Sequence, residues 1–135
     1  MKSKFLLLVL LLCTGFIFAE EQSASLTSPD GNIALKVMLT EAGSPVYSID
    51  FKGKKILGES SLGLRLEDAD FTKGLKIESV SEVKTIHDEY TIISGKRKNC
   101  VYDGLEKTVR FMNAKKQPLE MIFRLSNDGV AFRYF

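Results

Sequence analysis

The sequence contains very little cysteine and histidine. Its 135 residues include two cysteines, Cys13 and Cys100, and one histidine, His87. Cys13 lies in the leader described below, and Cys100 alone cannot form an internal disulfide, which excludes a disulfide-stapled scaffold. Whether Cys100 is free, buried or paired between chains stays open. One cysteine and one histidine are also too few for the usual zinc sites. Residues 86–89 are polar apart from Ile86 and contain no nucleophile motif, so we interpret His87 as a surface histidine.

The sequence also lacks an excess of either charge. It has 19 Lys and Arg against 17 Asp and Glu, and removal of Lys2 and Lys4 with the leader leaves the two signs equal. A protein that binds polyanions usually carries a basic excess or stripe, so no nucleic-acid partner is indicated. The short basic clusters at residues 54–55, 96–98 and 115–116 lie beside turn residues and are predicted to be solvated loop tips.

Only the N-terminus contains a long hydrophobic run. Lys2 and Lys4 precede an apolar run over residues 5–12, and Ala19 comes directly before two glutamates. This pattern predicts a signal peptide over residues 1–19, cleaved after Ala19. The run is shorter than the roughly 20 residues of a spanning helix, and Leu12 is too bulky to favour lipid attachment at Cys13. We therefore expect an exported protein that has no membrane contact once the signal peptide is removed.

Residues 20–135 form the predicted mature part. They show no 3.6-residue periodicity over twelve or more residues, and short alternating runs are separated by turn residues. This pattern predicts an all-β domain, either an antiparallel β-sandwich or a barrel of strands. The mature part is too short for a catalytic (β/α)8 barrel of about 250 residues. The predicted strands are residues 33–39, 46–51, 62–66, 75–83, 90–94, 105–111, 119–125 and 130–135.

Two turn motifs and one acidic segment are candidates for chemistry. Residues 29–32 predict a turn. Asn127-Asp128-Gly129 predicts a hairpin whose tight turn uses positive φ angles. We interpret Asp128 as a turn residue that satisfies the local backbone rather than as a catalytic acid. The carboxylates of residues 67–70 suggest calcium, but the segment lacks the spacing of a twelve-residue calcium loop, so that reading is not favoured.

The chain ends at Phe135 while an aromatic strand is still running. Chain termini are usually polar and frayed, and soluble proteins avoid unpaired strand edges. We therefore expect the domain to be incomplete at its C-terminus, as a truncated product or a fragment of a longer protein.

Several segments, in this order, resemble one enzyme family. Residues 26–32 (LTSPDGN), 43–47 (GSPVY), 51–54 (FKGK) and 61–64 (SLGL) resemble the opening of glycoside hydrolase family 97. Residues 122–134 (IFRLSNDGVAFRY) look like that family's hairpin, and the resemblance covers nearly all of the mature part.

This resemblance implies a fold, an activity and a partner. The fold implied is part of a β-super-sandwich, similar to galactose mutarotases, in front of a catalytic (β/α)8 barrel. Members are exported, largely bacterial α-glucosidases and α-galactosidases, so a periplasmic or extracellular location and an α-linked oligosaccharide substrate are implied for the parent. Family catalysis uses barrel carboxylates and a calcium ion held largely by glutamates, which would lie beyond Phe135. No catalytic, metal-binding or cofactor-binding residue is therefore assigned to this chain.

The resulting hypothesis is a non-catalytic sandwich over residues 20–135 that supports the barrel and helps shape its carbohydrate site. Arg124 and Arg133 flank the hairpin at positions that place them on one sheet face. They are candidates to contact the barrel or a sugar carboxylate, although pairing with surface acids is favoured. The alternatives are a free-standing carbohydrate-binding module and a secreted adhesion or scaffold sandwich. The lack of tryptophan, and tyrosines and phenylalanines at strand positions suited to the core, count against the module.

Overall fold

The computed structural model describes residues 23–94 and 98–135, which form nine strands and no helix. The predicted signal peptide lies outside these residues. The described part contains no helix long and apolar enough to span a membrane. The strands are β1 (Ser23–Thr27), β2 (Ile33–Leu39), β3 (Pro45–Phe51), β4 (Lys54–Ser61), β5 (Lys76–Val80), β6 (Lys84–Thr91), β7 (Asn99–Met112), β8 (Pro118–Ser126) and β9 (Gly129–Tyr134).

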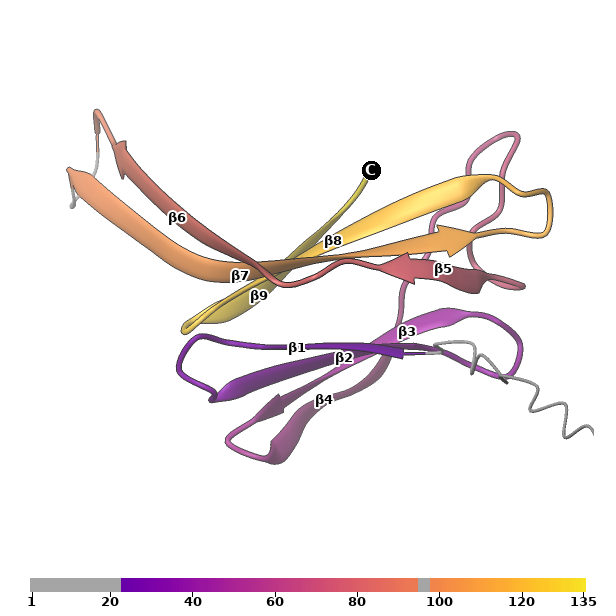
Figure 1. Cartoon of the computed structure of the whole chain (residues 1–135), viewed down its shortest axis with the longest axis horizontal. Helices are drawn as coiled ribbons and strands as arrows, with labels where there is room; N and C mark the ends of the chain where they lie inside the picture. The colour runs from indigo at the N-terminus through magenta and orange to yellow at the C-terminus, as the bar shows by residue number, and fades with distance from the viewer. Residues whose placement is uncertain (1–22, 95–97) are drawn as a thin grey trace, which may run out of the picture.

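The strands form two antiparallel sheets that face each other (Figure 1). The first sheet follows chain order, β1-β2-β3-β4, so each strand pairs with its successor. In β2 the alternate residues Ile33, Leu35 and Val37 are buried, as the sequence pattern predicts for a strand with one covered face. Leu26 of β1 and Ile49 of β3 lie opposite Leu35 in the register. The first strand, β1, was not among the predicted strands.

The second sheet has the order β5-β7-β8-β9, with β6 also paired to β7. This arrangement is possible because β7 has 14 residues and offers successive stretches of one edge to β5 and β6. The β6–β7 pair extends past the end of the sandwich and curves away from the first sheet (Figure 1). We call this extension, residues 84–94 with residues 98–106, the β6–β7 arm. The predicted strands at residues 75–83 and 90–94 have the wrong bounds, because the structure has β5 at Lys76–Val80 and β6 at Lys84–Thr91.

The core lies between the two sheets and confirms the sandwich. Buried apolar side chains from both inner faces form one cluster. Phe111 and Met121 are 0% exposed. Burying a side chain of this size contributes about 1.5–3 kcal/mol, so the inner faces of β7 and β8 are major sources of stability. The side chains that are most completely buried are Leu35, Val37, Pro45, Val109, Phe111, Met121, Phe123 and Leu125.

The predicted strand at residues 62–66 is wrong. This segment connects the two sheets, and its only strand-like pairing is a bridge between Arg65 and Asp70. Leu62 is buried whereas Leu66 is 49% exposed, so the leucines do not share a face. Gly63 has φ of 120° and approaches the carbonyl oxygen of Phe71 so closely that a Cβ there would lie 2.6 Å from it. The strand of this region is β4, which ends at Ser61, directly before the predicted one.

The β8–β9 hairpin is confirmed, but the reason given for its turn is wrong. Ser126 pairs with Gly129 across a two-residue loop, and none of the loop residues is among those with positive φ. Positive angles occur instead between β3 and β4, at Lys52 (φ 49°) and Gly53 (φ 75°). Two successive positive angles match the type I′ turn that suits the twist of a hairpin.

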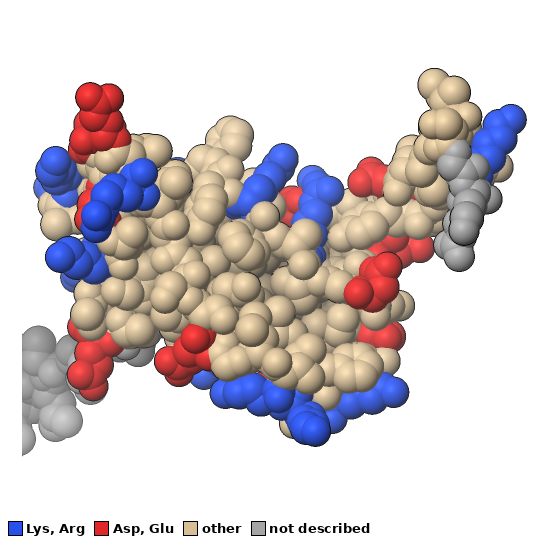
Figure 2. Space-filling view, turned by 180° about the vertical axis from the view of Figure 1, so that it is seen from behind, with Lys and Arg blue, Asp and Glu red and all other residues tan. Residues whose placement is uncertain are grey.

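The basic clusters follow the loop-tip prediction in part. Lys115 and Lys116 are exposed in the connection between β7 and β8, as predicted. Lys54 and Lys55 are exposed but begin β4, so they lie in a strand rather than at a tip. Residues 96–97 lie outside the described part. Figure 2 shows Lys and Arg gathered along the lower edge of the molecule, on the side of the first sheet.

Candidate functional site

The fold brings together the two turn motifs that the sequence singles out. The backbone N–H of Asp30, in the β1–β2 turn, donates to Oδ1 of Asn127, in the β8–β9 turn, at 3.0 Å. The two residues are 97 positions apart and lie in turns that connect strands of opposite sheets. Asn127 therefore acts as a clamp between the layers, a role that its position in a hairpin motif does not reveal.

The carboxylate of Asp30 holds its own turn in shape. It accepts hydrogen bonds from the hydroxyl of Ser28 at 2.6 Å and from the backbone N–H and side-chain amide of Asn32 at 3.0 and 2.6 Å. These bonds, that from Ser28 first, lower the pKa of Asp30 below its ordinary value. Both carboxylate oxygens are occupied within the turn, which makes Asp30 a structural acid.

Asp128 is also engaged locally. Its Oδ1 accepts a hydrogen bond from the hydroxyl of Ser126 at 2.5 Å. This is a side-chain contact across the turn, in keeping with the interpretation of Asp128 as a turn residue.

Arg124 and Arg133 lie on one face of the second sheet, as predicted. Ile122 pairs with Arg133 and Arg124 with Ala131, so these four residues share the outer face. Nε of Arg124 donates to Oε2 of Glu106 at 2.6 Å, and this bond raises the pKa of the guanidinium. Arg124 therefore pairs with an acid of the neighbouring strand, which agrees with the favoured prediction except that the Glu106 side chain is only 14% exposed. Arg133 is exposed beside it, in a shallow pocket of about 130 Å³.

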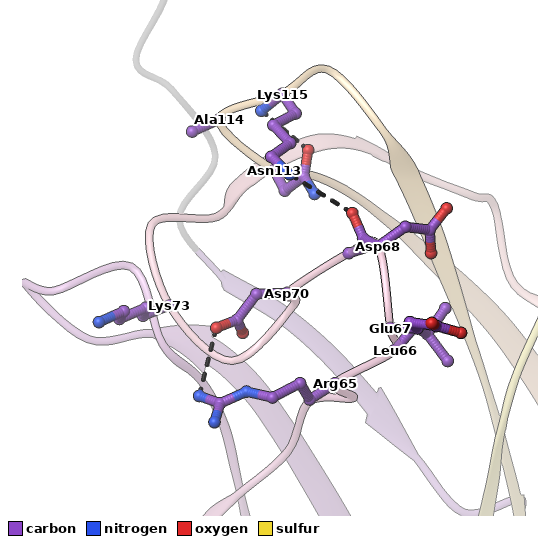
Figure 3. A pocket seen from close by; sticks show the side chains of 10 residues that line it. Arg65, Leu66, Glu67, Asp68, Asp70, Lys73, Asn113, Ala114 and Lys115 are labelled. Atoms are coloured by element: carbon purple, nitrogen blue, oxygen red, sulfur yellow. Dashed lines mark hydrogen bonds and ion pairs between the residues drawn. The ribbon is translucent and has the colours of Figure 1, made fainter.

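A larger pocket, of about 410 Å³, lies between the connection that follows β4 and the β7–β8 turn (Figure 3). On one wall, Arg65 pairs with Asp70 at 3.3 Å. Asp70 also accepts hydrogen bonds from the hydroxyl and backbone N–H of Thr72 at 2.6 and 2.9 Å. These bonds, the hydroxyl first, lower the pKa of Asp70. On the opposite wall, Nζ of Lys115 reaches the backbone oxygen of Asp68 at 3.4 Å.

The acidic segment in this pocket does not fit a calcium ion. Calcium takes six to eight oxygen ligands, several of them from converging carboxylates. The carboxylate of Asp70 points to Arg65, whereas that of Asp68 points to the other side of the loop (Figure 3). Across the described ranges, no three acidic, cysteine or histidine residues gather as a metal site would require.

His87 lies on the β6–β7 arm with an acid on each side. Its Nδ1 contacts Oδ1 of Asp103 at 2.5 Å, and its Nε2 contacts Oε1 of Glu89 at 3.3 Å. The bond to Asp103, followed by that to Glu89, raises the pKa of His87 above 6.5. The side chain is 56% exposed, which confirms a surface histidine. Cys100, on the same arm, is free and partly buried.

The arm also exposes apolar side chains, and one of them, Tyr90, is among the tyrosines predicted to suit the core. Tyr90 is 52% exposed, Val101 60% and Ile93 fully exposed at 103%. These side chains are uncovered because the arm projects beyond the sandwich (Figure 1).

Comparison with known proteins shows the family to which the chain is similar. Residues 26–135 match the family model described as Glycosyl-hydrolase 97 N-terminal. A retaining alpha-galactosidase of Bacteroides thetaiotaomicron is 33% identical over 99% of this chain and 19% of its own length. A probable retaining alpha-galactosidase of Streptomyces bingchenggensis is 30% identical over 68% of this chain and 14% of its own.

Solved structures agree with these sequence matches. A beta-arabinopyranosidase superposes with a TM-score of 0.77 at 36% identity, over 82% of this chain and 18% of that enzyme. A family 97 enzyme of Pseudoalteromonas sp. strain K8, solved with panose, gives a TM-score of 0.73 at 32% identity, over 82% of this chain and 17% of that one. The chain thus spans less than a fifth of the length of these relatives. On its sequence and its sandwich alike, the chain belongs to the N-terminal domains of glycoside hydrolase family 97.

Proposed function

We propose that residues 20–135 are the non-catalytic N-terminal sandwich of an exported α-glycosidase, and that they support a catalytic barrel of the same polypeptide and help shape its carbohydrate site. One observation carries this proposal: the chain matches only 14–19% of the length of two α-galactosidases, through an N-terminal domain. The remaining length of such an enzyme has room for a barrel of about 250 residues.

The chemistry of the described acids supports this division of roles. Glycoside hydrolysis uses two carboxyl groups that face each other across the scissile bond, about 5–9.5 Å apart. Asp30, Asp70 and Asp128 each accept hydrogen bonds from a serine or threonine two residues away, and these bonds shape their own turns. We therefore assign the catalytic carboxylates, and the calcium ion that the family implies, to the rest of the parent polypeptide.

The β6–β7 arm is our candidate for the contact with that barrel. It projects from the sandwich (Figure 1) and exposes Tyr90 and Val101, which the register places on opposite faces of the arm, together with Ile93. Apolar side chains left uncovered on both faces suit a segment that other parts of a larger protein cover. Ile93→Lys in the full-length parent should lower its thermal midpoint and its activity, because a lysine would have to be buried at the interface. The same change in this chain alone should improve solubility. An unchanged midpoint in the parent would remove the arm from the interface.

The decisive experiment compares this chain with its full-length parent on p-nitrophenyl α-glucoside and α-galactoside, with calcium and then with a chelator. We expect the parent to cleave at least one substrate and lose activity with the chelator, while this chain is inactive. Turnover by this chain alone would overturn the structural reading of its acids.

A binding assay separates the alternative function. Titration of this chain with panose should give no saturable heat if the domain acts only as part of the enzyme. Saturable binding by the isolated chain would favour a free-standing carbohydrate-binding module.

The proposed export of the protein is tested by determining where the mature protein begins. We propose that the protein is secreted or periplasmic and begins at Glu20 after cleavage. Intact-mass analysis of the protein from the periplasmic and extracellular fractions of a bacterial host measures this directly. Recovery in the cytoplasm with residues 1–19 attached would contradict it.

A further inference from the structure

We propose that the catalytic barrel packs against the outer face of the second sheet, and that Arg133 binds an aspartate or glutamate of the barrel there. The outer face is the side of the second sheet that is turned away from the first sheet. The inference deepens the proposed function and rests on it, because it takes the chain to be the N-terminal domain of a longer enzyme.

Arg133 differs from the two other arginines of the outer face. Arg110 is held by two glutamates, at 2.6 and 3.0 Å, and Arg124 is held by Glu106 at 2.6 Å. Arg133 is exposed, and it makes no hydrogen bond or ion pair with the residues at 23–94 and 98–135. A guanidinium has five N–H donors and matches a carboxylate with two of them. Arg133 is therefore available to bind a carboxylate from outside the domain.

The surroundings of Arg133 suit an acidic side chain. The pocket of about 130 Å³ beside it is lined by apolar Ile122 and Ala131 and by Arg124. Because Glu106 already neutralises Arg124, the charge that an incoming group meets in this pocket is that of Arg133. An aspartate or glutamate combines a short apolar stem with a negative head. The stem matches the apolar lining, and the head matches the guanidinium.

The β6–β7 arm continues the outer face and makes it concave. The arm curves away from the first sheet, which is the direction in which the outer face is turned (Figure 1). Tyr90 pairs with Cys100, which lies an even number of residues before Glu106 in β7, so both lie on the face of Glu106 and Arg124. The Tyr90 side chain, 52% exposed, therefore belongs to the same surface as Arg133.

This combination of side chains and shape is typical of a protein interface. Tyrosine and arginine are enriched among the residues that contribute most to binding between proteins. A concave surface can also receive the convex outside of another domain. The barrel is the partner that we infer, because the solved relatives are matched over only 17–18% of their length, so most of such an enzyme is available to cover a face of this domain.

Zero-length cross-linking identifies the carboxylate. In the full-length parent carrying Arg133→Lys, a carbodiimide should couple the introduced amine to an aspartate or glutamate of the barrel, and peptide mass spectrometry should locate the bond. Arg124→Lys is the matched control, since it should be coupled to Glu106 in this chain and in the parent alike. Coupling of the control alone would overturn the proposal. Coupling between two parent molecules would overturn the choice of occupant.

Thermal unfolding gives an independent readout. Arg133→Gln removes no polar contact within this chain, so it should leave the midpoint of this chain unchanged and lower that of the parent by about 1 °C or more. Arg124→Gln leaves Glu106 without its partner and should lower both midpoints. A parent that tolerates Arg133→Gln contradicts the contact whether or not it hydrolyses glycosides, so this failure is distinct from failure of the proposed function.

A sugar carboxylate is the other group that would match Arg133. Titration of this chain with glucuronate should give no saturable heat if the pocket serves the barrel. Saturable binding that Arg133→Gln abolishes would assign the pocket to an acidic sugar and overturn the choice of occupant.

Discussion

The hydroxyl of Tyr134 accepts a hydrogen bond from the backbone N–H of Gly63 at 3.1 Å and donates one to the carbonyl oxygen of the same residue at 3.2 Å. Gly63 lies on the connection between the two sheets, and Tyr134 lies at the end of β9, 71 positions later. The phenol of Tyr134 therefore satisfies both backbone groups of Gly63, which lies outside the first sheet, and it anchors the end of β9 to the connection between the sheets.

Removal of this hydroxyl should destabilise the domain. Tyr134→Phe leaves the N–H and the C=O of Gly63 without their partner, and each net hydrogen bond contributes about 0.5–1.5 kcal/mol. We expect a loss of about 1–3 kcal/mol in the free energy of unfolding. Urea denaturation measures it, with Tyr90→Phe as the control, because Tyr90 is exposed and should change stability by less than about 0.5 kcal/mol. Equal effects of the two substitutions would contradict the anchor.

Gly63 itself should not tolerate a side chain. Its φ of 120° is unfavourable for other residues, and an added Cβ would lie 2.6 Å from the carbonyl oxygen of Phe71. Strain at such a position costs about 1–3 kcal/mol before the clash is counted, so Gly63→Ala should lower stability by about 3 kcal/mol or more. Gly58→Ala is the matched control, since a Cβ there meets nothing within 4 Å. A thermal midpoint unchanged by Gly63→Ala would show that the connection can rearrange.

The contact between the two turns predicts a smaller effect. Asn127→Ala removes the acceptor for the N–H of Asp30 and should cost about 0.5–1.5 kcal/mol. Asp128→Asn keeps an oxygen for the hydroxyl of Ser126 and should leave the unfolding midpoint within error. Exchange of the Asp30 amide should also accelerate in Asn127→Ala alone. An Asp30 amide equally protected in both variants would exclude the bond to Asn127.

The acids around His87 predict that the stability of the fold depends on pH and that their contribution to it decreases as the pH rises. Its folded pKa lies above 6.5, so the pairing with Asp103 and Glu89 stabilises the fold fully below the unfolded pKa of about 6.5. That contribution is lost as the pH rises through the folded pKa. The stability difference between the protein and His87→Gln should therefore be largest between about pH 5 and 6.5, where both acids are ionised, and shrink above it. A constant difference from pH 5 to 9 would contradict the pairing.

Local patterns predicted most of the strands. Residues 33–39 lie between turn residues and have apolar side chains at alternate positions, which predicts a strand with one covered face. The structure has β2 at these same residues. The hairpin at residues 126–129 is likewise readable, since its signal lies within a few neighbouring residues. Residues 62–66 alternate just as well in sequence but form no strand, because they cross between the two sheets, and there Leu62 is buried whereas Leu66 is exposed. Alternation in the sequence therefore shows neither that one side is covered nor that a neighbouring strand is present.

The candidate site was predictable only in part. The role of Asp128 in its turn and the surface position of His87 follow from the residues beside them. Asn127 sits in the same motif as Asp128, yet its bond to Asp30 joins residues 97 apart, and no local pattern contains that partner. The exposure of Tyr90 was missed for the same reason. Whether a strand residue is covered depends on what lies over it, and the β6–β7 arm has nothing opposite it within the described part of the sandwich.

By itself, the sequence determined the class of the fold, the turns that divide the strands and the membership of a family. Alternation, turn residues and motif order are features of neighbouring residues, so they can be recognised without the structure. Only the tertiary structure decided that Asn127 accepts a hydrogen bond from Asp30, that Tyr134 bonds to Gly63 and that β9 lies over β3. These relationships depend on how two sheets are stacked and offset. The relative position of the two sheets is set by the packing of the whole core. Every buried side chain contributes to that packing, so no single segment of the sequence predicts it.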